Sequence, residues 1–340
     1  GGGTNYEFFV SGSSVQNGAS ATYSTSTLLN GQIVTVRVTN ASGCSVLSSG
    51  ITMTVNPLPI ATIVSNDADN SICAGSPISF TATPSGGSNY NFRVDGVSVQ
   101  SGASNVYTTS ILSDGDVVDV IVTSVATCTG TSAGITMNVD PAPTVANAGP
   151  DQLNLCGLTS TTLAGNIPGV GTGLWTVISG GGSFAPNTDP TTTFTGVAGT
   201  THVLQWTITN GVCASSSDQV TIRFDQTPSA AVAGADIAQC ANGTFTLNAT
   251  SPAIGTGVWS VISGTATITN ASSFNTSVTG VPVNSSATLR WTISSGSCPS
   301  TTDDVVLTNN TNPTPTLASD DIDNTICPGA TSVYTAGFAP

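Results

Sequence analysis

The first part of this chain recurs almost unchanged further along, with no gap between the two copies. Residues 2–23, GGTNYEFFVSGSSVQNGASATY, correspond to residues 86–107, GGSNYNFRVDGVSVQSGASNVY, and Cys44 falls on Cys128 at the same offset of 84 residues. Self-similarity at a fixed spacing is the signature of tandem modules. Because such a chain repeats one small unit, it is more typical of a stalk, fibre or adhesin than of an enzyme with one unique active site.

Two kinds of module make up the sequence. Type A is complete over residues 57–140; its back half opens the chain at residues 1–56, and its front half closes the chain at residues 313–340. Type B occurs twice, at residues 141–225 and 226–312, where GTGLWTVISG in the first copy matches GTGVWSVISG in the second. The order is therefore half-A, A, B, B, half-A.

The two half modules fit together at the ends of the chain. Pro340 corresponds to Pro84, and Gly2 corresponds to Gly86, so the end nearly meets the beginning in module register. The simplest interpretation is one period of an A-A-B-B repeat within a longer chain; the alternative is an arbitrary boundary. We expect an elongated array of modules, each roughly 30–40 Å long, given strands of 7–10 residues.

Composition limits the classes of partner. Charged residues are 6% of the chain, against a usual ~25%, Lys is absent, and the net charge is −14. Nucleic acids and anionic membrane surfaces attract basic patches, so we expect neither as a partner. No apolar run is long enough to predict insertion into a membrane. The hydrophobic share of 38% and the many β-branched residues favour folded β structure over disorder.

The apolar pattern within each module has a period of two residues. It is visible at residues 90–94, 117–122, 203–208 and 219–224, and Asn210-Gly211 between the last two runs predicts a hairpin. Short strands, frequent turns and a module length of about 85 residues predict an all-β fold of tandem immunoglobulin-like antiparallel β-sandwiches. The linkers between modules are short and contain proline, which predicts stiff joints.

Two segments of type B carry a resemblance to a known class of repeats: AGPDQLNLCG at residues 148–157 and WTITNGVC at residues 206–213. The chain resembles the PKD-like and other immunoglobulin-like repeats in very long secreted surface proteins of Bacteroidota, such as gliding-motility adhesins of the SprB kind. That resemblance implies an extracellular location, a rod-like architecture and an adhesive or scaffolding role. Export by the type 9 secretion system is implied only by analogy, because no C-terminal sorting domain is present. The usual WDFGDG segment of PKD repeats is also missing.

The cysteines are isolated and evenly distributed. There are eight: Cys44, Cys73, Cys128, Cys156, Cys213, Cys240, Cys298 and Cys327. None forms a CxxC pair and the chain has one His, so the pattern indicates disulfides and an oxidising compartment rather than zinc.

Two disulfide schemes are compatible with the spacing. We expect bonds within modules, Cys73–Cys128, Cys156–Cys213 and Cys240–Cys298, with Cys44 and Cys327 pairing outside this stretch. These bonds require the first cysteine of each module to lie beside the last strand, which simple immunoglobulin topology does not provide. The competing scheme joins sequence neighbours, Cys44–Cys73, Cys128–Cys156, Cys213–Cys240 and Cys298–Cys327. Either way, we expect reduction, rather than chelation of metal ions, to lower the melting temperature.

An acidic motif just after two of the linkers is a candidate calcium site. Its residues are Asp67, Asp69 and Asn70 in the complete type A module, and Asp321, Asp323 and Asn324 at the chain end. Alternating Asp and Asn oxygens are ligands that Ca²⁺ prefers. The competing interpretation is that Asp and Asn stabilise turns through side-chain to backbone hydrogen bonds. We expect no other cofactor.

The tryptophans and the single histidine are the candidates for sugar binding and catalysis, and their sequence context favours a structural role. The four tryptophans, Trp175, Trp206, Trp259 and Trp291, recur at matching places in the two type B modules. They are either stacking platforms for sugars or core residues, and their alternation with Ser and Thr favours the core. His202 has no counterpart in the second type B module, and no nucleophile motif accompanies it. We therefore do not expect an enzyme.

These observations predict a structural repeat region of a giant extracellular adhesin or filament at the cell surface, which extends a binding tip or grips surfaces. The expected partners are neighbouring repeats, other copies of the chain in a filament, and a surface polysaccharide or substratum. The alternative is an array of glycan-binding accessory modules from a secreted polysaccharide-degrading protein. Exposed tryptophan side chains would favour that alternative.

Overall fold

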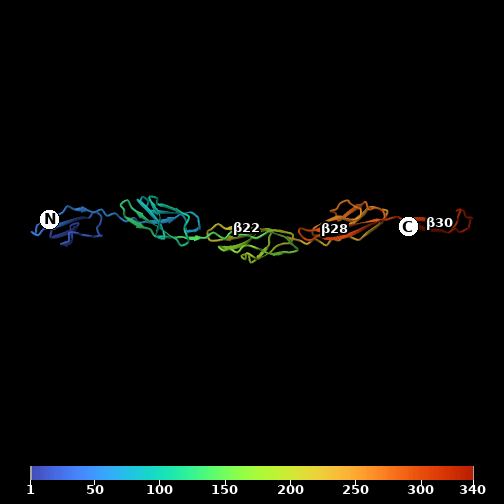
Figure 1. The fold of residues 1–340 in the computed structure, drawn as a ribbon, viewed down its shortest axis with the longest axis horizontal. Helices are drawn as coiled ribbons and strands as arrows, with labels where there is room; N and C mark the ends of the chain where they lie inside the picture. Colours follow the sequence, from blue (N-terminus) through green and yellow to red (C-terminus); the bar gives the residue numbers. More distant parts are fainter. Residues whose placement is uncertain (1, 340) are drawn as a thin grey trace. The chain divides into compact units, whose positions relative to one another are not determined.

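The computed structural model describes residues 2–339, and within them the chain forms β-strands and turns, with no helix and hence no helix able to cross a membrane (Figure 1). Gly1 and Pro340, at the outer ends of the two half modules, lie outside the described residues. The chain divides into two compact units. The first contains residues 1–142 together with 210–214, and the second contains residues 143–209 and 215–340.

The complete type A module in the first unit is a sandwich of two sheets. One sheet has the order β11-β8-β6, formed by β6 (Thr62–Ser65), β8 (Ile78–Thr83) and β11 (Val106–Thr109). The other has the order β10-β9-β12-β13, with β14 also beside β12. Its strands are β9 (Asn89–Val94), β10 (Val97–Gly102), β12 (Val117–Thr123), β13 (Thr129–Thr131) and β14 (Ile135–Thr136). All these pairings are antiparallel.

A short parallel pair runs along the side of this sandwich. Strand β7 (Ser71–Cys73) pairs in parallel with β15 (Asn138–Asp140), and Cys73 lies opposite Asp140. Because β15 is the last strand of the module, this pairing places Cys73 at the end from which the linker to the next module leaves. The module is therefore an immunoglobulin-like sandwich with a separate two-stranded parallel sheet, β7 with β15.

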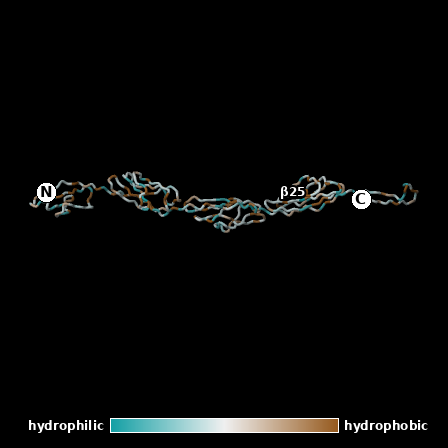
Figure 2. Tube along the Cα trace, in the orientation of Figure 1, coloured by the Kyte–Doolittle hydropathy of each residue, from teal (hydrophilic) through white to brown (hydrophobic). Residues whose placement is uncertain are grey.

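Strand alternation builds the core between the sheets. In β12, Val118, Val120 and Val122 point inward with no exposed surface, while the residues between them face outward. Phe80 and Phe92 meet these valines from the two sheets and are also fully buried. Figure 2 shows hydrophobic and hydrophilic stretches interspersed along the whole chain trace. A period of two residues is what a strand with one buried face requires.

Residues 5–52 in the same unit form one sheet rather than a sandwich. Its order is β2-β1-β3-β4, with β5 also beside β3. The strands are β1 (Asn5–Val10), β2 (Ser13–Gly18), β3 (Ile33–Thr39), β4 (Ser45–Leu47) and β5 (Ile51–Thr52). These strands repeat the pattern of β9, β10, β12, β13 and β14, which is the second sheet of the complete module.

Each type B module in the second unit also has two sheets. In the first module they are β16-β22-β21-β18 and β17-β20-β19, formed by β16 (Gln152–Cys156), β17 (Ser160–Thr162), β18 (Thr172–Ser179), β19 (Ser183–Ala185), β20 (Thr193–Thr195), β21 (Thr201–Thr209) and β22 (Ser216–Asp225). In the second they are β23-β29-β28-β25 and β24-β27-β26, formed by β23 (Ile237–Cys240), β24 (Phe245–Asn248), β25 (Thr256–Ser263), β26 (Thr267–Ile268), β27 (Asn275–Thr279), β28 (Ser285–Ser294) and β29 (Thr301–Asn310).

The parallel pairing at the end of the type A module recurs in both type B modules. Strand β16 runs parallel to β22 with Cys156 opposite Asp225, and β23 runs parallel to β29 with Cys240 opposite Asn310. At the end of the chain, β30 (Thr314–Ser319) and β31 (Tyr334–Ala339) form a separate two-stranded hairpin.

Tryptophan pairs dominate the type B cores. Trp259 and Trp291 lie opposite each other on β25 and β28 with ring centroids 5.1 Å apart. Gly257 lies two residues before Trp259, and a Cβ there would collide with the Trp291 ring. Gly173 has the same relation to Trp206 in the first type B module. The recurring GTG-x-W sequence is therefore a packing motif, in which glycine leaves room for the partner indole.

The predicted all-β, immunoglobulin-like fold is confirmed. The four predicted runs lie in β9, β12, β21 and β22, and Asn210-Gly211 lies in the turn that joins β21 to β22. Asp95 and Gly96, between β9 and β10, both have a positive φ, of 49° and 78°. That conformation is the one required by the tight turn favoured in hairpins.

We expect Gly257→Ala to destabilise the second type B module by about 1–3 kcal/mol, because the added methyl group forces the Trp291 ring out of its packed position. Scanning calorimetry of the oxidised chain should show one transition moving to lower temperature. The control is Gly102→Ala on β10, where no atom lies within 4 Å of the new Cβ. Equal melting curves for Gly257→Ala and wild type would contradict this packing role.

Candidate functional site: the joints between modules

The joint at the end of the type A module is a disulfide between two successive modules. Cys73 bonds to Cys213, which lies 140 residues further along in the turn between β21 and β22, and their Cα atoms are 4.8 Å apart. The turn residues 210–214 belong to the first compact unit together with the type A module. The joint is therefore closed by covalent and non-covalent contacts within one unit.

Asp140 organises the polar contacts of this joint. Its Oδ2 accepts a hydrogen bond from the Val212 backbone N–H at 3.1 Å, while Asn210 Nδ2 donates to the Pro141 carbonyl at 2.8 Å. Gly211 lies directly against the Asp140 carboxylate, and a Cβ at that position would collide with it. The turn must therefore carry glycine here for the carboxylate to reach the backbone.

The joint between the two type B modules, in the second unit, repeats this arrangement. Cys156 bonds to Cys298 in the turn between β28 and β29, over 142 residues, with a Cα–Cα distance of 5.1 Å. Asp225 Oδ2 accepts from both the backbone N–H and the hydroxyl of Ser297, each at 2.8 Å. A Cβ at Gly296 would collide with the Asp225 carboxylate, as at Gly211 in the first joint.

Electrostatics favour the ionised form of Asp225. The Ser297 backbone N–H, the Ser297 hydroxyl and the Arg223 guanidinium, in that order, lower the pKa of this carboxyl from 3.8 to about 2. Arg223 Nε donates to Asp225 Oδ1 at 2.8 Å, and Asp225 is only 4% exposed. A buried carboxylate with three donors is fixed in place as an acceptor.

The predicted disulfides Cys73–Cys128, Cys156–Cys213 and Cys240–Cys298 are wrong, and so is the competing scheme that joins sequence neighbours. The structure bonds the first cysteine of one module to the second cysteine of the next. Within the described residues, Cys44, Cys128, Cys240 and Cys327 are free thiols. Pairing of Cys44 and Cys327 outside this stretch stays a prediction.

Strand geometry explains this correction. Cys128 precedes β13 and Cys73 lies opposite the end of β15, so the two cysteines are at opposite ends of the module's last strand segment. Residues 129–140 span roughly 36 Å at ~3.3 Å per extended residue. A disulfide requires Cα atoms about 4.4–6.8 Å apart. Cys73 does lie beside the last strand, β15, as the intramodule scheme required. It lies opposite the last residue of that strand, Asp140, which is the end farther from Cys128.

The candidate calcium residues act as turn formers. Asp67 Oδ1 accepts from the Asp69 backbone N–H at 3.2 Å, and Asp69 Oδ1 accepts from the Ser71 N–H at 3.1 Å. Asn70 has a positive φ of 56° and accepts from the Ser65 hydroxyl at 2.6 Å. The hydrogen bond from Asp69 lowers the pKa of Asp67.

The second copy of this motif shows the same turn bonds. Asp321 Oδ1 accepts from the Asp323 N–H at 3.3 Å, Asp323 accepts from the Thr325 N–H at 3.1 Å, and Asn324 has a positive φ of 59°. Over residues 2–339, no three or more His, Cys, Asp and Glu side chains are grouped so as to hold a metal ion. Calcium binding at these turns stays a prediction.

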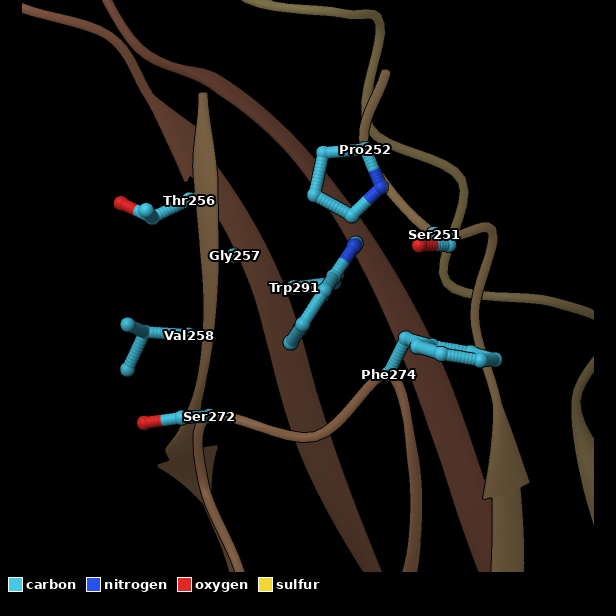
Figure 3. A pocket seen from close by; sticks show the side chains of 8 residues that line it. All are labelled: Ser251, Pro252, Thr256, Gly257, Val258, Ser272, Phe274 and Trp291. Atoms are coloured by element: carbon cyan, nitrogen blue, oxygen red, sulfur yellow. The ribbon is translucent and has the colours of Figure 1, made fainter. Parts of the chain in front are cut away.

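The tryptophans are core residues. Trp175, Trp206, Trp259 and Trp291 are each 2% exposed or less, so none offers a face for a sugar ring. A hollow of about 470 Å³ in the second type B module is lined by Ser251, Pro252, Thr256, Gly257, Val258, Ser272, Phe274 and Trp291 (Figure 3). Trp291 lines this hollow but is only 1% exposed. Exposed tryptophan side chains would have favoured glycan binding, and all four are buried.

His202 is buried, and its contacts are with core aromatic rings and a backbone carbonyl. Its ring packs edge-on against Phe194 and Phe224, with centroids 5.2 Å and 5.6 Å away. Its Nδ1 lies 3.0 Å from the Gly181 carbonyl oxygen, which fixes a turn against the sheet. No solvent-accessible face of the imidazole remains for proton transfer, since the residue has no exposed surface.

Comparison with known proteins finds no matching protein-family profile and no matching curated protein. The solved structures that match include several tandem immunoglobulin domains. Domains 1–5 of Sidekick-1 are 13% identical, with a TM-score of 0.38 and coverage of 99% of this chain and 78% of that one. Extracellular domains 3–5 of Drosophila OTK are 15% identical, with a TM-score of 0.35 and coverage of 75% and 100%. An I-band fragment of titin is 12% identical, with a TM-score of 0.37 and coverage of 74% and 96%. At TM-scores below 0.5, none of these similarities supports a functional assignment.

We expect the second joint to weaken in acid. A carboxyl with a lowered folded pKa stabilises the folded state above its unfolded pKa, near 3.8, and that contribution is lost as the pH falls towards 2. The shift corresponds to about 2 kcal/mol. Urea unfolding at a series of pH values between 2 and 5 should show this loss in wild type and not in Asp225→Asn.

The control for this measurement is Asp304→Asn. Asp304 pairs with Arg290 at 2.7 Å on the surface of the second type B module, where solvent screens the charges. The Asp304→Asn variant should keep most of the acid dependence. An unchanged acid dependence in Asp225→Asn would contradict the role of this carboxylate.

Proposed function

We propose that this chain is a structural repeat region of an extracellular protein that resists tension, in which disulfides join the three complete modules one to the next. The observation that carries the proposal is the pairing of Cys73 with Cys213 and of Cys156 with Cys298. A bond inside one module would stabilise only that module. A bond between modules instead prevents the joint from opening, which is what a stalk or fibre under tension requires.

The two disulfides also form overlapping loops. Residues 156–213 lie inside both the loop closed by Cys73–Cys213 and the loop closed by Cys156–Cys298. A force applied to the two ends of the chain is therefore carried by both bonds in series. Even after complete unfolding, the chain between Cys73 and Cys298 can extend only through the 57-residue segment between Cys156 and Cys213 (213 − 156).

An extracellular location is part of this proposal. Disulfides that hold a structure together persist in oxidising compartments and are rare in the cytosol. The net charge of −14 favours solubility and disfavours binding to polyanions. Within residues 2–339, each of the four arginines pairs with a carboxylate, which leaves the remaining acidic residues as the excess surface charge.

The finer role that we propose is a segment of a cell-surface adhesin or filament that extends a binding tip or grips a surface. Its support is the sequence resemblance of residues 148–157 and 206–213 to repeats of Bacteroidota surface adhesins. A role in gliding and export by the type 9 system belong to the same proposal. The partners would be the neighbouring modules, further copies of the chain, and a surface polysaccharide or substratum.

Single-molecule force spectroscopy tests whether the chain resists tension in this way. Oxidised chain pulled from its two ends should unfold with a contour length shorter than that of reduced chain. Reduction frees 225 residues between Cys73 and Cys298 (298 − 73), where the oxidised chain allows 57. The difference of 168 residues (225 − 57) corresponds to about 600 Å at ~3.6 Å per residue.

Cysteine variants provide the matched controls. Cys73→Ser should release only the first loop, whereas Cys44→Ser, at a free cysteine in the described structure, should leave the contour length unchanged. Equal contour lengths for oxidised and reduced wild type would contradict the proposal.

A further inference from the structure

The parallel strand pairing at the second joint contains a β-bulge. In β16, Leu153 and Asn154 lie opposite the single residue Arg223 of β22, where a regular ladder would pair one residue with one. The corresponding pairings of β7 with β15 and of β23 with β29 are regular. Bulges re-aim side chains and are frequent beside binding and active sites. Among the three complete modules, this irregularity is specific to the first type B module.

A hollow of about 520 Å³ opens at this bulge, between the two type B modules. It is lined by Leu153, Asn154, Thr201, Arg223 and Asp225 of the first module and by Gly296 and Ser297 of the second. Thr201 lies opposite Arg223 on β21, so Arg223 has the bulge on one side and a hydroxyl on the other. Small-molecule sites have volumes of roughly 300–1,000 Å³ and often lie between domains.

The guanidinium of Arg223 keeps unused donors. Its Nε donates to Asp225 Oδ1 at 2.8 Å, and its side chain is 50% exposed. Arg93 and Arg290 each bond a carboxylate through both Nε and a terminal nitrogen. Over residues 2–339, the carboxylate bond of Arg223 uses Nε alone, so its two terminal nitrogens remain as donors for a ligand.

The contacts of the second joint hold this hollow in shape. Asp225, which orients Arg223, accepts from the backbone N–H and the hydroxyl of Ser297 at 2.8 Å each. The disulfide Cys156–Cys298, with a Cα–Cα distance of 5.1 Å, fixes the second module at the same place. A site that is already ordered loses less conformational entropy when a ligand binds.

The first joint has the same architecture with a different lining. Asn138 takes the place of Arg223, two residues before the carboxylate of the joint, and its Nδ2 donates to Ser71 Oγ at 3.2 Å. The hollow at this joint measures about 340 Å³ and is lined by Asp67, Ser71, Ile72, Cys73, Ser76, Pro77, Val212 and Ala214. This lining contains a carboxylate and no guanidinium, so the two joints differ in what they can bind.

The lining of the second joint favours a neutral ligand rich in hydroxyl groups. Asn154, Thr201 and Ser297 offer an amide and two hydroxyls, which can both donate and accept hydrogen bonds. Leu153, which is 46% exposed, adds an apolar surface. Asp225 already balances the charge of Arg223, and the chain has a net charge of −14, so an anion is not favoured. A pyranose ring combines adjacent hydroxyls with an apolar C–H face.

We propose that this hollow binds a neutral polysaccharide at the joint between the two type B modules. The terminal nitrogens of Arg223 donate to two adjacent hydroxyls of one sugar, and Leu153 packs against its C–H face. Recognition relies on hydrogen bonds and on Leu153 rather than on an aromatic platform, so it does not require an exposed tryptophan. The proposal rests on the proposed function and gives a site to the polysaccharide partner expected there.

An NMR titration of the oxidised full chain tests this site. The probes are three neutral oligosaccharides, cellohexaose, mannohexaose and xylohexaose, and the charged hexagalacturonate. We expect at least one neutral probe to shift the backbone signals of Asn154, Thr201 and Ser297. The proposal would be overturned if no neutral probe shifted them, or if hexagalacturonate bound more tightly than every neutral probe.

Two variants locate the binding in the hollow. We expect Arg223→Gln to weaken binding of the neutral probe about tenfold and Asn154→Ala about threefold, because hydrogen bonds to charged donors contribute more than neutral ones. Asn154 is exposed, so its variant should keep the wild-type melting curve. The matched control is Arg290→Gln, which removes an arginine outside the hollow and should bind as wild type does. Wild-type affinity in both Arg223→Gln and Asn154→Ala would also overturn the proposal.

A cysteine variant tests whether both modules are needed. Cys298→Ser frees the second module from the bulge, and we expect weaker binding, whereas Cys73→Ser at the first joint should bind as wild type does. Wild-type affinity in Cys298→Ser would overturn a site shared by two modules. If binding failed while oxidised and reduced chains still differed in contour length, this site alone would be wrong. Binding without that difference would contradict the resistance to tension alone.

Discussion

The parallel pairing of a short strand with the end of the last strand decides the architecture of the joints. In three modules it places the first cysteine opposite the final strand residue: Cys73 opposite Asp140, Cys156 opposite Asp225, and Cys240 opposite Asn310. The second cysteine lies in a hairpin at the other end of the sandwich. A disulfide within one module is therefore out of reach, and Cys73 and Cys156 instead bond to cysteines of the next module.

The sandwiches could be predicted from the sequence, whereas the disulfide pairing could not. Alternation at residues 117–122 and the turn at Asp95-Gly96 are local signals, and local signals determine strands and hairpins. Disulfide partners depend on which end of the sandwich each cysteine reaches. In a repeat, every pairing scheme gives constant spacings, so regular spacing could not distinguish one scheme from another. The three-residue strand β7 carries no alternation that would have revealed its parallel pairing.

Disulfides between modules stabilise something different from the predicted disulfides within modules. On the chain-entropy model, closing a loop of 140 residues contributes about 5 kcal/mol, and a loop of 57 residues contributes about 4 kcal/mol. The gain in loop entropy is small, because closure entropy grows only with the logarithm of length. The larger consequence is that unfolding of one module is coupled to the next: the loop closed by Cys73 and Cys213 contains parts of both. Stability thereby becomes a property of pairs of modules.

The residue opposite each bonded first cysteine, Asp140 or Asp225, also contacts the hairpin of the following module. Asp140 and Asp225 precede type B modules, whose hairpins carry glycine two residues before the cysteine, and a Cβ at either glycine would collide with the carboxylate. The type A hairpin carries Ala126 at that place, and the linker residue before that module is Asn56. Asn310 likewise ends the second type B module, before the type A segment at residues 313–339. At both disulfide joints, the carboxylate before the linker therefore fits the glycine turn of the following type B module.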